Sequence, residues 1–443
     1  MTTTLSTRRR LDRADAAAAG VGLGVFAAAA VVGAVLGQIG HPVRASAAPL
    51  FAHWLPHVGP GTPLALIVAA LVVRYGPRLA AELSWSRLRA ITYVAAVGWI
   101  LALALVDGVQ RGLTGRLTTS SEYLREVGGI GSVGALLHNF TSRILDSQPD
   151  AWTTHVAGHP PGAVLVFVLL NRIGLGGGGW AAVACVLVGA AAAVAVPETV
   201  RLLGDERAAR VAVPFAVLFP GAVWIGASAD GLFAGVAACG VALTTHGLVR
   251  RNPGSAVAGG ALLGCGVYLS YGLVLLAPLV AAAAIVVRRI RPVAWCAFGA
   301  LVVAAAFTVS GFWWPDGYHL VVQRYYQGIA SHRPYLYWVW ANLAAVTACV
   351  GPAALAVIRR SVAAAGRQAS CPPCWALPVA AAVAVLAADL SGLSKAEVER
   401  IWLPFAVWFA AGAALLPEAA RRHWLTVQAV TALAVNHLLL TAW

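Results

Sequence analysis

The sequence predicts an all-α, polytopic transmembrane bundle of about 13 spans, and three observations lead to this fold class. Hydrophobic residues make up 60% of the 443-residue chain and charged residues only 11%, whereas about a quarter of the residues in a soluble domain are charged. Apolar runs of about 20 residues, the length that crosses a bilayer as a helix, recur along the chain. Arginines gather between alternate runs, as they do in helical membrane proteins.

The predicted spans follow the apolar runs directly. They fall at 16–40, 62–76, 88–107, 180–200, 209–226, 230–248, 255–270, 271–288, 292–310, 336–357, 375–391, 401–417 and 424–442. Another apolar run, 161–174, has only about 14 residues and is short for a complete crossing. We therefore expect 161–174 to be a re-entrant helix or a helix on the membrane surface.

The 30 arginines and one lysine orient the chain. If the N-terminus is cytoplasmic and 161–174 stays outside, 21 basic and 7 acidic residues lie inside, against 10 of each outside. This is the asymmetry that the positive-inside rule requires. The net charge of +14 then orients the protein and does not indicate nucleic-acid binding. We predict a multi-pass plasma-membrane protein with a cytoplasmic N-terminus and an extracytoplasmic C-terminus.

This topology places the long loops on the outer face, so any chemistry is expected there. The first outer loop of the core covers 108–179 and the second covers about 311–335. Aromatic residues crowd the second loop, which is typical of an interfacial belt, with sugar stacking as the alternative. The chain is predicted to be one transmembrane domain, 1–443, in which 1–87 adds two N-terminal spans to a core at 88–443.

Two acids are candidates for a general base. Asp107 lies at the outer end of a predicted span, where partial desolvation suits a base, although a helix-ending acid in water is the simpler interpretation. Glu122 and Tyr123 follow hydroxyl residues at 118–121 that could cap a short surface helix. Either Glu122 and Tyr123 contact a polar substrate, or the segment is a plain amphipathic helix.

His155 and His159 precede two prolines, Pro160 and Pro161. Four-residue spacing would align the histidines on a continuous helix as a metal pair, but Gly158 and the prolines disfavour that helix. We expect the histidines to bind a phosphate or sugar and assign no metal ligand, with a divalent metal as the alternative. The prolines suit a helix start, whose free N–H groups and dipole favour an anion.

Three further charged residues lie near the outer face in this topology. Asp230 stands between two predicted spans, either as a binding residue or as the N-cap of the next helix. Arg400 has the planar fork that suits a phosphate, and the alternative is an ion pair with nearby Glu397.

Together these motifs resemble the GT-C superfamily of integral-membrane glycosyltransferases, which use polyprenyl-phosphate sugars. In that family an acid follows a span and precedes a long outer loop, and Asp107 matches its position. The run from His159 to Pro161 resembles the motif of protein-mannosyltransferase-like members, and 397–402 resembles a Glu-Val-Glu-Arg-(Ile/Leu)-Trp pattern of actinobacterial relatives. The acidic pair common in the family is missing because Gly108 follows Asp107, which makes Glu122 a rival base.

The resemblance implies transfer of arabinose or mannose from a polyprenyl-phosphate donor to a cell-envelope glycan or lipoglycan, in cell-wall biogenesis. Asp107 or Glu122 would deprotonate the acceptor hydroxyl. Arg400 and His159 would hold the donor phosphate from opposite sides of one outward-facing cavity, and membrane lipid would surround the spans. The Arg-, Ala- and Gly-rich composition also suggests an actinobacterial source. The rival interpretation is a non-catalytic transporter or flippase of lipid-linked sugar, a class that tends to show internal repeats.

Overall fold

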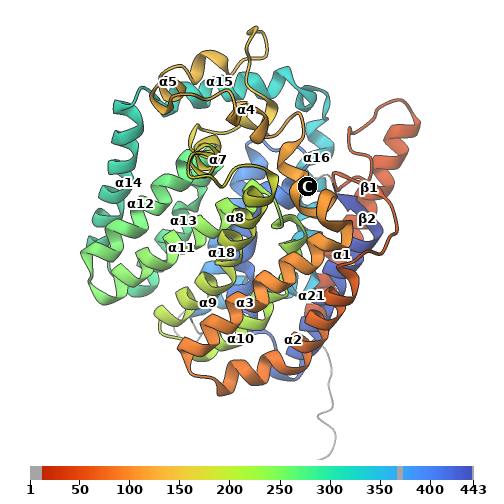
Figure 1. Ribbon diagram of the computed structural model, residues 1–443. Helices are drawn as coiled ribbons and strands as arrows, with labels where there is room; N and C mark the ends of the chain where they lie inside the picture. Colours follow the sequence, from red (N-terminus) through yellow and green to blue (C-terminus); the bar gives the residue numbers. More distant parts are fainter. Residues whose placement is uncertain (1–11, 367–372, 442–443) are drawn as a thin grey trace, which may run out of the picture.

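The computed structural model describes residues 12–366 and 373–441 and confirms the predicted helical, multi-pass fold class (Figure 1). Within these residues, seven helices are long and apolar enough to cross a bilayer, or eight if one bent pair counts as a single span. The other predicted spans coincide with shorter or more polar helices. The predicted count of thirteen therefore stays a prediction.

The seven spans are distributed along most of the chain. They are α1 (Arg13–Gln38), α2 (Thr62–Glu82), α3 (Trp85–Ala104) with η1 (Leu105–Asp107), α8 (Gly178–Ala190) with α9 (Ala192–Leu202), α11 (Ala229–Arg250), α14 (Arg291–Val309), and η9 (Pro373–Trp375) with α18 (Ala376–Leu390).

Shorter or more polar elements lie between these spans and complete the bundle. They are α7 (Gly162–Arg172), α10 (Glu206–Val217), η5 (Pro220–Trp224), α12 (Pro253–Leu269), η6 (Tyr271–Leu276), α13 (Ala277–Val287), α20 (Leu403–Ala406), η10 (Val407–Leu415) and α21 (Glu418–Leu438). In α12 and α14 the backbones approach closely, since a Cβ on Gly260 would lie 1.8 Å from the Cys296 carbonyl oxygen. Small residues at helix contacts are how membrane helices achieve close packing.

The loops that carry the predicted site are built from short elements. The first contains η2 (Gln110–Thr114), η3 (Arg116–Thr118), α4 (Leu124–Val127), α5 (Val133–His138), η4 (Thr141–Arg143) and α6 (Thr154–Ala157). The second contains α15 (Trp314–Gln327) and η7 (Ile329–His332), and α19 (Val398–Ile401) follows α18. Figure 1 shows α4, α5 and α15 together at the upper end of the molecule, opposite the lower ends of α2 and α10.

The ambiguous run 161–174 forms α7, which has only 11 residues and begins directly after Pro161. Such a helix is about 16 Å long and cannot cross a 30 Å hydrocarbon core. The predicted helix start after the proline pair is therefore confirmed. Its orientation relative to the membrane stays a prediction.

Two predicted span boundaries were wrong. The run 336–357 is divided into α16 (Tyr335–Val350) and α17 (Pro352–Ala365), which meet at 108°. The break falls at Gly351, whose φ of +76° is outside the helical region, and Pro352 has no N–H to continue the α16 ladder. The run 424–442 was predicted as helix throughout, but α21 ends at Leu438 and the chain continues as a strand.

This strand, β2 (Leu439–Thr441), pairs antiparallel with β1 (Ala52–Trp54), and Ala52 lies opposite Thr441. Apolar content alone cannot distinguish a helix end from a short strand. The pairing satisfies backbone groups of both segments, which would be costly to leave unpaired near a bilayer. It also attaches the connection between α1 and α2 to the end of α21.

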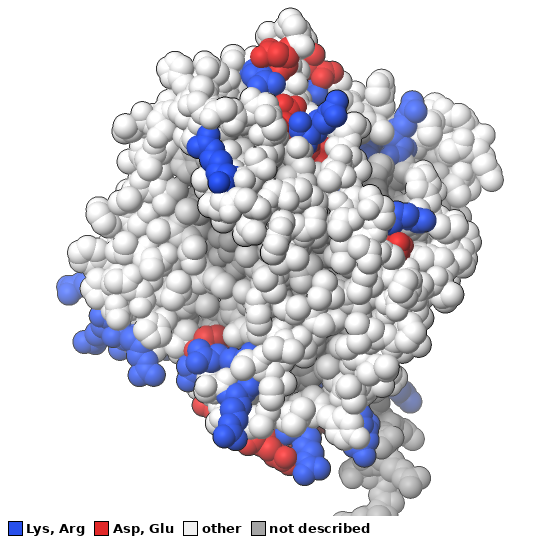
Figure 2. All heavy atoms as spheres, viewed as in Figure 1, with Lys and Arg blue, Asp and Glu red and all other residues white. Residues whose placement is uncertain are grey.

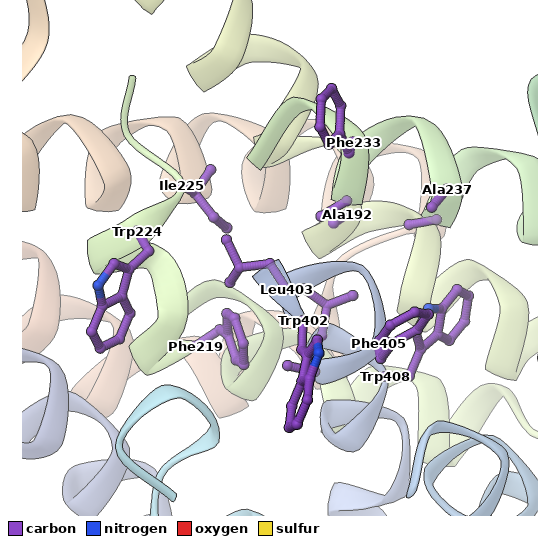
Figure 3. Packing of buried hydrophobic residues seen from close by; sticks show 14 of the residues in the cluster. Ala192, Phe219, Trp224, Ile225, Phe233, Ala237, Trp402, Leu403, Phe405 and Trp408 are labelled. Atoms are coloured by element: carbon purple, nitrogen blue, oxygen red, sulfur yellow. The ribbon is translucent and has the colours of Figure 1, made fainter. Parts of the chain in front are cut away.

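The apolar core is built from side chains of many helices. Figure 3 shows Trp224 of η5 and Phe233 of α11 on different sides of the buried side chains around α20, which include Trp402 and Trp408. All four side chains are buried. This core supports the helix starts and short loops that carry the charged residues.

On the face drawn in Figure 2, few charged side chains lie near the middle of the molecule. Figure 2 shows Lys, Arg, Asp and Glu mainly at the upper and lower ends, with a broad uncharged band between them. Burying isolated charge in hydrocarbon is costly, so this band is the face expected to contact lipid.

We predict that the first outer loop and the α9–α10 connection lie on opposite sides of the membrane. Arg172 and Arg207 are both exposed, so a cysteine at either position is open to a reagent on its own side. With the native cysteines replaced, a membrane-impermeant maleimide added to intact cells should modify Arg172→Cys and not Arg207→Cys. Modification of Arg207→Cys alone would reverse the orientation, and permeabilised cells provide the control because both positions should then react.

Candidate active site

The structure brings all the predicted site residues except Asp107 into one buried cluster at the ends of several elements. The cluster comprises Glu122 and Tyr123 before α4, His155 and His159 in and after α6, Asp230 at the start of α11, and Glu397 and Arg400 at α19. We refer to this set as the outer acidic cluster. It joins three loops that lie far apart in the sequence.

Arg400 is the centre of the cluster's charge network. Its Nη1 donates to Asp230 Oδ2, and its Nη2 donates to Glu397 Oε2 at 3.0 Å. Arg400 and Asp230 are both buried. Although burial opposes the charge on Arg400, the carboxylates of Asp230 and Glu397 raise its pKa. The ion-pair alternative for Arg400 is thus what the structure shows.

Asp230 does not cap α11, because the N-cap is Ser228, whose side chain accepts a hydrogen bond from the Asp230 N–H. The capping alternative for Asp230 is therefore wrong. A carboxylate in the first turn is still stabilised by the helix dipole. Asp230 is thus left to pair with Arg400.

Glu397 is held between two arginines in a strained loop. Its second carboxylate oxygen accepts from Arg333 Nη2 at 3.0 Å, and Arg333 Nη1 donates to the Lys395 carbonyl at 2.6 Å. Ala396 and Glu397 both have positive φ, 69° and 64°. Each such non-glycine residue costs on the order of 1–3 kcal/mol and persists only when its surroundings impose it.

Glu122 is buried on the other side of the cluster, and its exposed fraction is 3%. Burial raises its pKa to about 7, while the Arg400 charge acts in the opposite direction. His155 Nδ1 lies 3.3 Å from Glu122 Oε1 and 2.9 Å from the Ser121 carbonyl oxygen. Burial lowers the pKa of His155 to about 3, so the imidazole is neutral and its contact with Glu122 is no ion pair.

Tyr123 and His159 attach the cluster to the apolar core. The Tyr123 hydroxyl lies 3.0 Å from His159 Nδ1, which also lies 2.8 Å from the His155 carbonyl oxygen. The Tyr123 ring packs against Phe167 of α7, and the His159 ring against Phe233 of α11. Tyr123 is therefore a buried support in this structure. The hydroxyls at 118–121 do not cap α4, whose N-cap is Tyr123 without a side-chain hydrogen bond.

Asp107 lies in a different network. Its two carboxylate oxygens contact His57 Nε2 at 2.8 Å and Arg116 Nη2 at 2.9 Å. Arg116 also donates to the Thr441 carbonyl oxygen at 2.8 Å. Asp107 thus connects the α1–α2 connection, the first outer loop and β2, and in the described part of the chain its ion pairs do not include the outer acidic cluster.

Sequence reasoning missed several of these partners. Arg333 and His57 were not chosen because each pairs with an acid 50 or more residues away in the sequence, and Arg116 was not chosen although its partner Asp107 lies nine residues before it. Glu399 was also missed: it is fully buried, one oxygen accepts from the Phe51 N–H at 2.9 Å, and the other has no hydrogen-bond partner among the described residues. The sequence signal that could have identified Glu399 was its position two residues after Glu397.

Among the described residues, no group of three or more His, Cys, Asp or Glu side chains is arranged to hold a metal ion. Asp230 and Glu397 pair with Arg400, and Glu122 lies against His155. Metal dependence stays an untested alternative, and no step below is written through a metal.

A small apolar cavity lies among α3, α8, α9 and α10. Alanine, glycine, isoleucine, valine and phenylalanine line it, and no member of the outer acidic cluster contributes. The polar chemistry and this cavity are therefore separate features. We base the site on the charged contacts.

No family model and no curated protein matches the sequence, but solved structures similar to this chain were found. They include ArnT from Cupriavidus metallidurans in the apo state (19% identity, TM-score 0.47), the same protein bound to undecaprenyl phosphate (17%, 0.45), and the Archaeoglobus fulgidus oligosaccharyltransferase tethered with an acceptor peptide (13%, 0.38). The similarities cover 75%, 73% and 73% of this chain, but only 60%, 60% and 49% of those proteins. At such identities and scores, this chain's activity, substrates and partners depend on its own residues.

We predict strong coupling between Arg400 and Asp230 in stability. Arg400→Met should destabilise the protein by roughly 3–5 kcal/mol, because it leaves buried Asp230 without a counter-charge. Adding Asp230→Asn should recover part of this loss. Thermal unfolding of the detergent-solubilised single and double variants measures the coupling.

The control is Arg207→Met, which removes a fully solvated ion pair with Glu418 and should cost about 0–1 kcal/mol. If the Arg400 and Asp230 effects instead add within about 0.5 kcal/mol, the two residues are not coupled.

Proposed function

We propose that the chain is a GT-C-type membrane glycosyltransferase that moves a sugar from a polyprenyl-phosphate donor to a hydroxyl acceptor on the extracytoplasmic face. The observation that carries this proposal is the outer acidic cluster, in which Glu122 is poised as a base near neutral pH beside the fixed charge of Arg400. The motif resemblance of His159 to Pro161 and of 397–402 supports it. Arabinose or mannose is the proposed sugar, and a cell-envelope glycan or lipoglycan the acceptor.

Glu122 is the proposed general base, in preference to Asp107. A base works best when its pKa lies near the operating pH, and burial raises the pKa of Glu122 to about 7. Asp107 has both oxygens engaged by His57 and Arg116. A carboxylate held in this way gives up two interactions when it accepts a proton, so it is the poorer acceptor.

The reaction balances as a single displacement. Glu122 takes the proton of the acceptor hydroxyl, the oxygen forms a bond to the anomeric carbon, and the bond from that carbon to the phosphate oxygen breaks. The phosphodiester of the donor becomes a phosphomonoester, so negative charge on the phosphate increases as the bond breaks. Positioned cations and N–H groups that meet this charge accelerate the reaction.

Arg400 first neutralises Asp230 and Glu397, and His159 Nδ1 contacts the Tyr123 hydroxyl. We keep both as candidate donor contacts, with Arg400 chiefly fixing the two acids in place. Because Glu122 is buried, the acceptor reaches it only when covering segments of the outer loops move. When these segments close again over the bound substrates, they exclude water from the reacting groups.

The first test of this proposal compares Glu122→Gln with Asp107→Asn. Glu122→Gln keeps shape and removes proton-accepting ability, so transfer should fall by about 10²–10⁴-fold. Asp107→Asn should retain more transfer and mainly lower thermal stability, since it weakens the contacts with His57 and Arg116. Transfer is measured with purified protein and a panel of polyprenyl-phosphate sugars.

The opposite pattern, with transfer lost in Asp107→Asn and retained in Glu122→Gln, would give the base to Asp107. Absence of transfer from every donor by the wild-type protein would favour the transporter interpretation.

The second test is the dependence of transfer on pH. A base acts only when deprotonated, and the pKa of Glu122 is raised to about 7. The value of kcat/KM should therefore rise about tenfold per pH unit below pH 7 and level off above it. The residual activity of Glu122→Gln should lack this rise. An identical profile in wild type and variant would contradict the assignment.

A further inference from the structure

Lys395 is the single lysine of the chain and lies two residues before Glu397. Among the described residues, the buried cations are Arg333, Lys395 and Arg400. Both arginines have carboxylate partners, whereas Lys395 has no carboxylate within ion-pair distance in the described part of the chain. Most of the Lys395 side chain is covered by protein, which holds its ammonium in place, and none of the described acids forms an ion pair with it.

The surroundings of Lys395 form a built site. Its ammonium lies over two tyrosine rings, 5.9 Å from the centroid of Tyr325 and 5.2 Å from that of Tyr326. The Tyr325 hydroxyl accepts from the Lys395 N–H at 2.8 Å, which leaves the hydroxyl hydrogen available for donation. Aromatic faces stabilise a cation and leave its N–H groups free for an anion.

The backbone around Lys395 is fixed from several sides. Asn342 of α16 accepts from the Ala396 N–H at 3.2 Å and donates to the Ser394 carbonyl at 2.7 Å. Arg333 donates to the Lys395 carbonyl itself. These contacts hold the left-handed conformation at Ala396 and Glu397, where backbone strain would otherwise relax. The position of Lys395 is therefore determined by the fold.

Electrostatics favours Lys395 over Arg400 as the partner of an incoming anion. A phosphate at Arg400 would approach Asp230 and Glu397, both of which already occupy the guanidinium. At Lys395 it would meet a cation that no described carboxylate neutralises. Burial and the nearby Arg333 charge lower the pKa of Lys395, a shift that a bound anion would oppose.

We propose that Lys395, with the Tyr325 hydroxyl beside it, is the binding site for the phosphate group of the lipid-linked donor. This inference rests on the proposed function for the identity of the donor. Lys395 lies two residues before Glu397, next in the chain to the loop that carries Glu397 and Arg400, so it offers a cation to the charge that a leaving phosphate gains. Lysine serves here as a point charge, which suits a phosphate that rotates as it leaves.

The experiment uses the fact that Lys395 is the only side-chain amine. The purified full-length protein is acylated in detergent with an N-hydroxysuccinimide ester, and the rate at Lys395 is measured by mass spectrometry, with the α-amino group as an internal reference. At about ten times its dissociation constant, polyprenyl phosphate should slow acylation of Lys395 about tenfold. The prenol of equal length, which lacks the phosphate, should give no protection.

Two further additions distinguish the sources of phosphate. Protection by inorganic phosphate at high concentration would support a site that recognises the phosphate group itself. Protection by phosphatidylglycerol equal to that by polyprenyl phosphate would overturn the proposal, because Lys395 would then be a general interfacial lysine. Equal rates with and without polyprenyl phosphate, or equal protection by the prenol, would overturn it as well.

Variants give an independent measurement. Lys395→Met should weaken polyprenyl-phosphate binding about 10- to 100-fold, the usual effect of one charged hydrogen bond, and Lys395→Arg should weaken it less. The matched control is Arg125→Met, which removes an exposed cation of the first outer loop and should leave binding unchanged. Unchanged binding in Lys395→Met contradicts the proposal. Protection of Lys395 without any sugar transfer would retain the phosphate site and reject the transferase.

Discussion

The buried pairing of Arg400 with Asp230 and Glu397 is the interaction on which the outer face of this molecule depends. It connects the start of α11 to the short helix α19, and Arg333 extends it toward the second outer loop. A buried arginine is stable only while its acids are present, and each acid is stable only while the arginine is present. The cluster therefore specifies one arrangement of three loops, and the apolar core beneath it supplies the rigidity.

The two N-terminal spans are more than an addition to the bundle. Their connection contributes His57 to the Asp107 network and the Phe51 N–H to buried Glu399. The ring of Phe51 also lies 5.3 Å from the Arg333 guanidinium. Residues outside the predicted core thus contact both acidic networks of the outer face, and the domain boundary placed at residue 87 separates spans that are structurally linked.

The sequence was most informative where the physical signal was local. Apolar runs predicted most helices, and the proline pair predicted the start of α7 at Gly162. Polar groups at a membrane edge cost free energy, so those found there were chosen as candidates for function. These candidates do lie together in the structure, and they are Glu122, His155, His159, Asp230, Glu397 and Arg400. What the sequence did not reveal was pairing across long separations. Arg116 and Thr441 meet across 325 residues, and Asp107 is separated from the other acids by its ion pairs with His57 and Arg116.

The β1–β2 pairing has a consequence for the order of biosynthesis. The partners of Asp107 come from residue 57, residue 116 and, through Arg116, the carbonyl of Thr441. A chain inserted into the membrane from its N-terminus holds the first two long before Thr441 leaves the ribosome. Until then, Arg116 lacks its hydrogen bond to the Thr441 carbonyl oxygen, and β1 in the α1–α2 connection lacks the strand with which it pairs. The network around Asp107 is therefore completed only after residue 441 has been synthesised, well after His57 and Arg116 are in place.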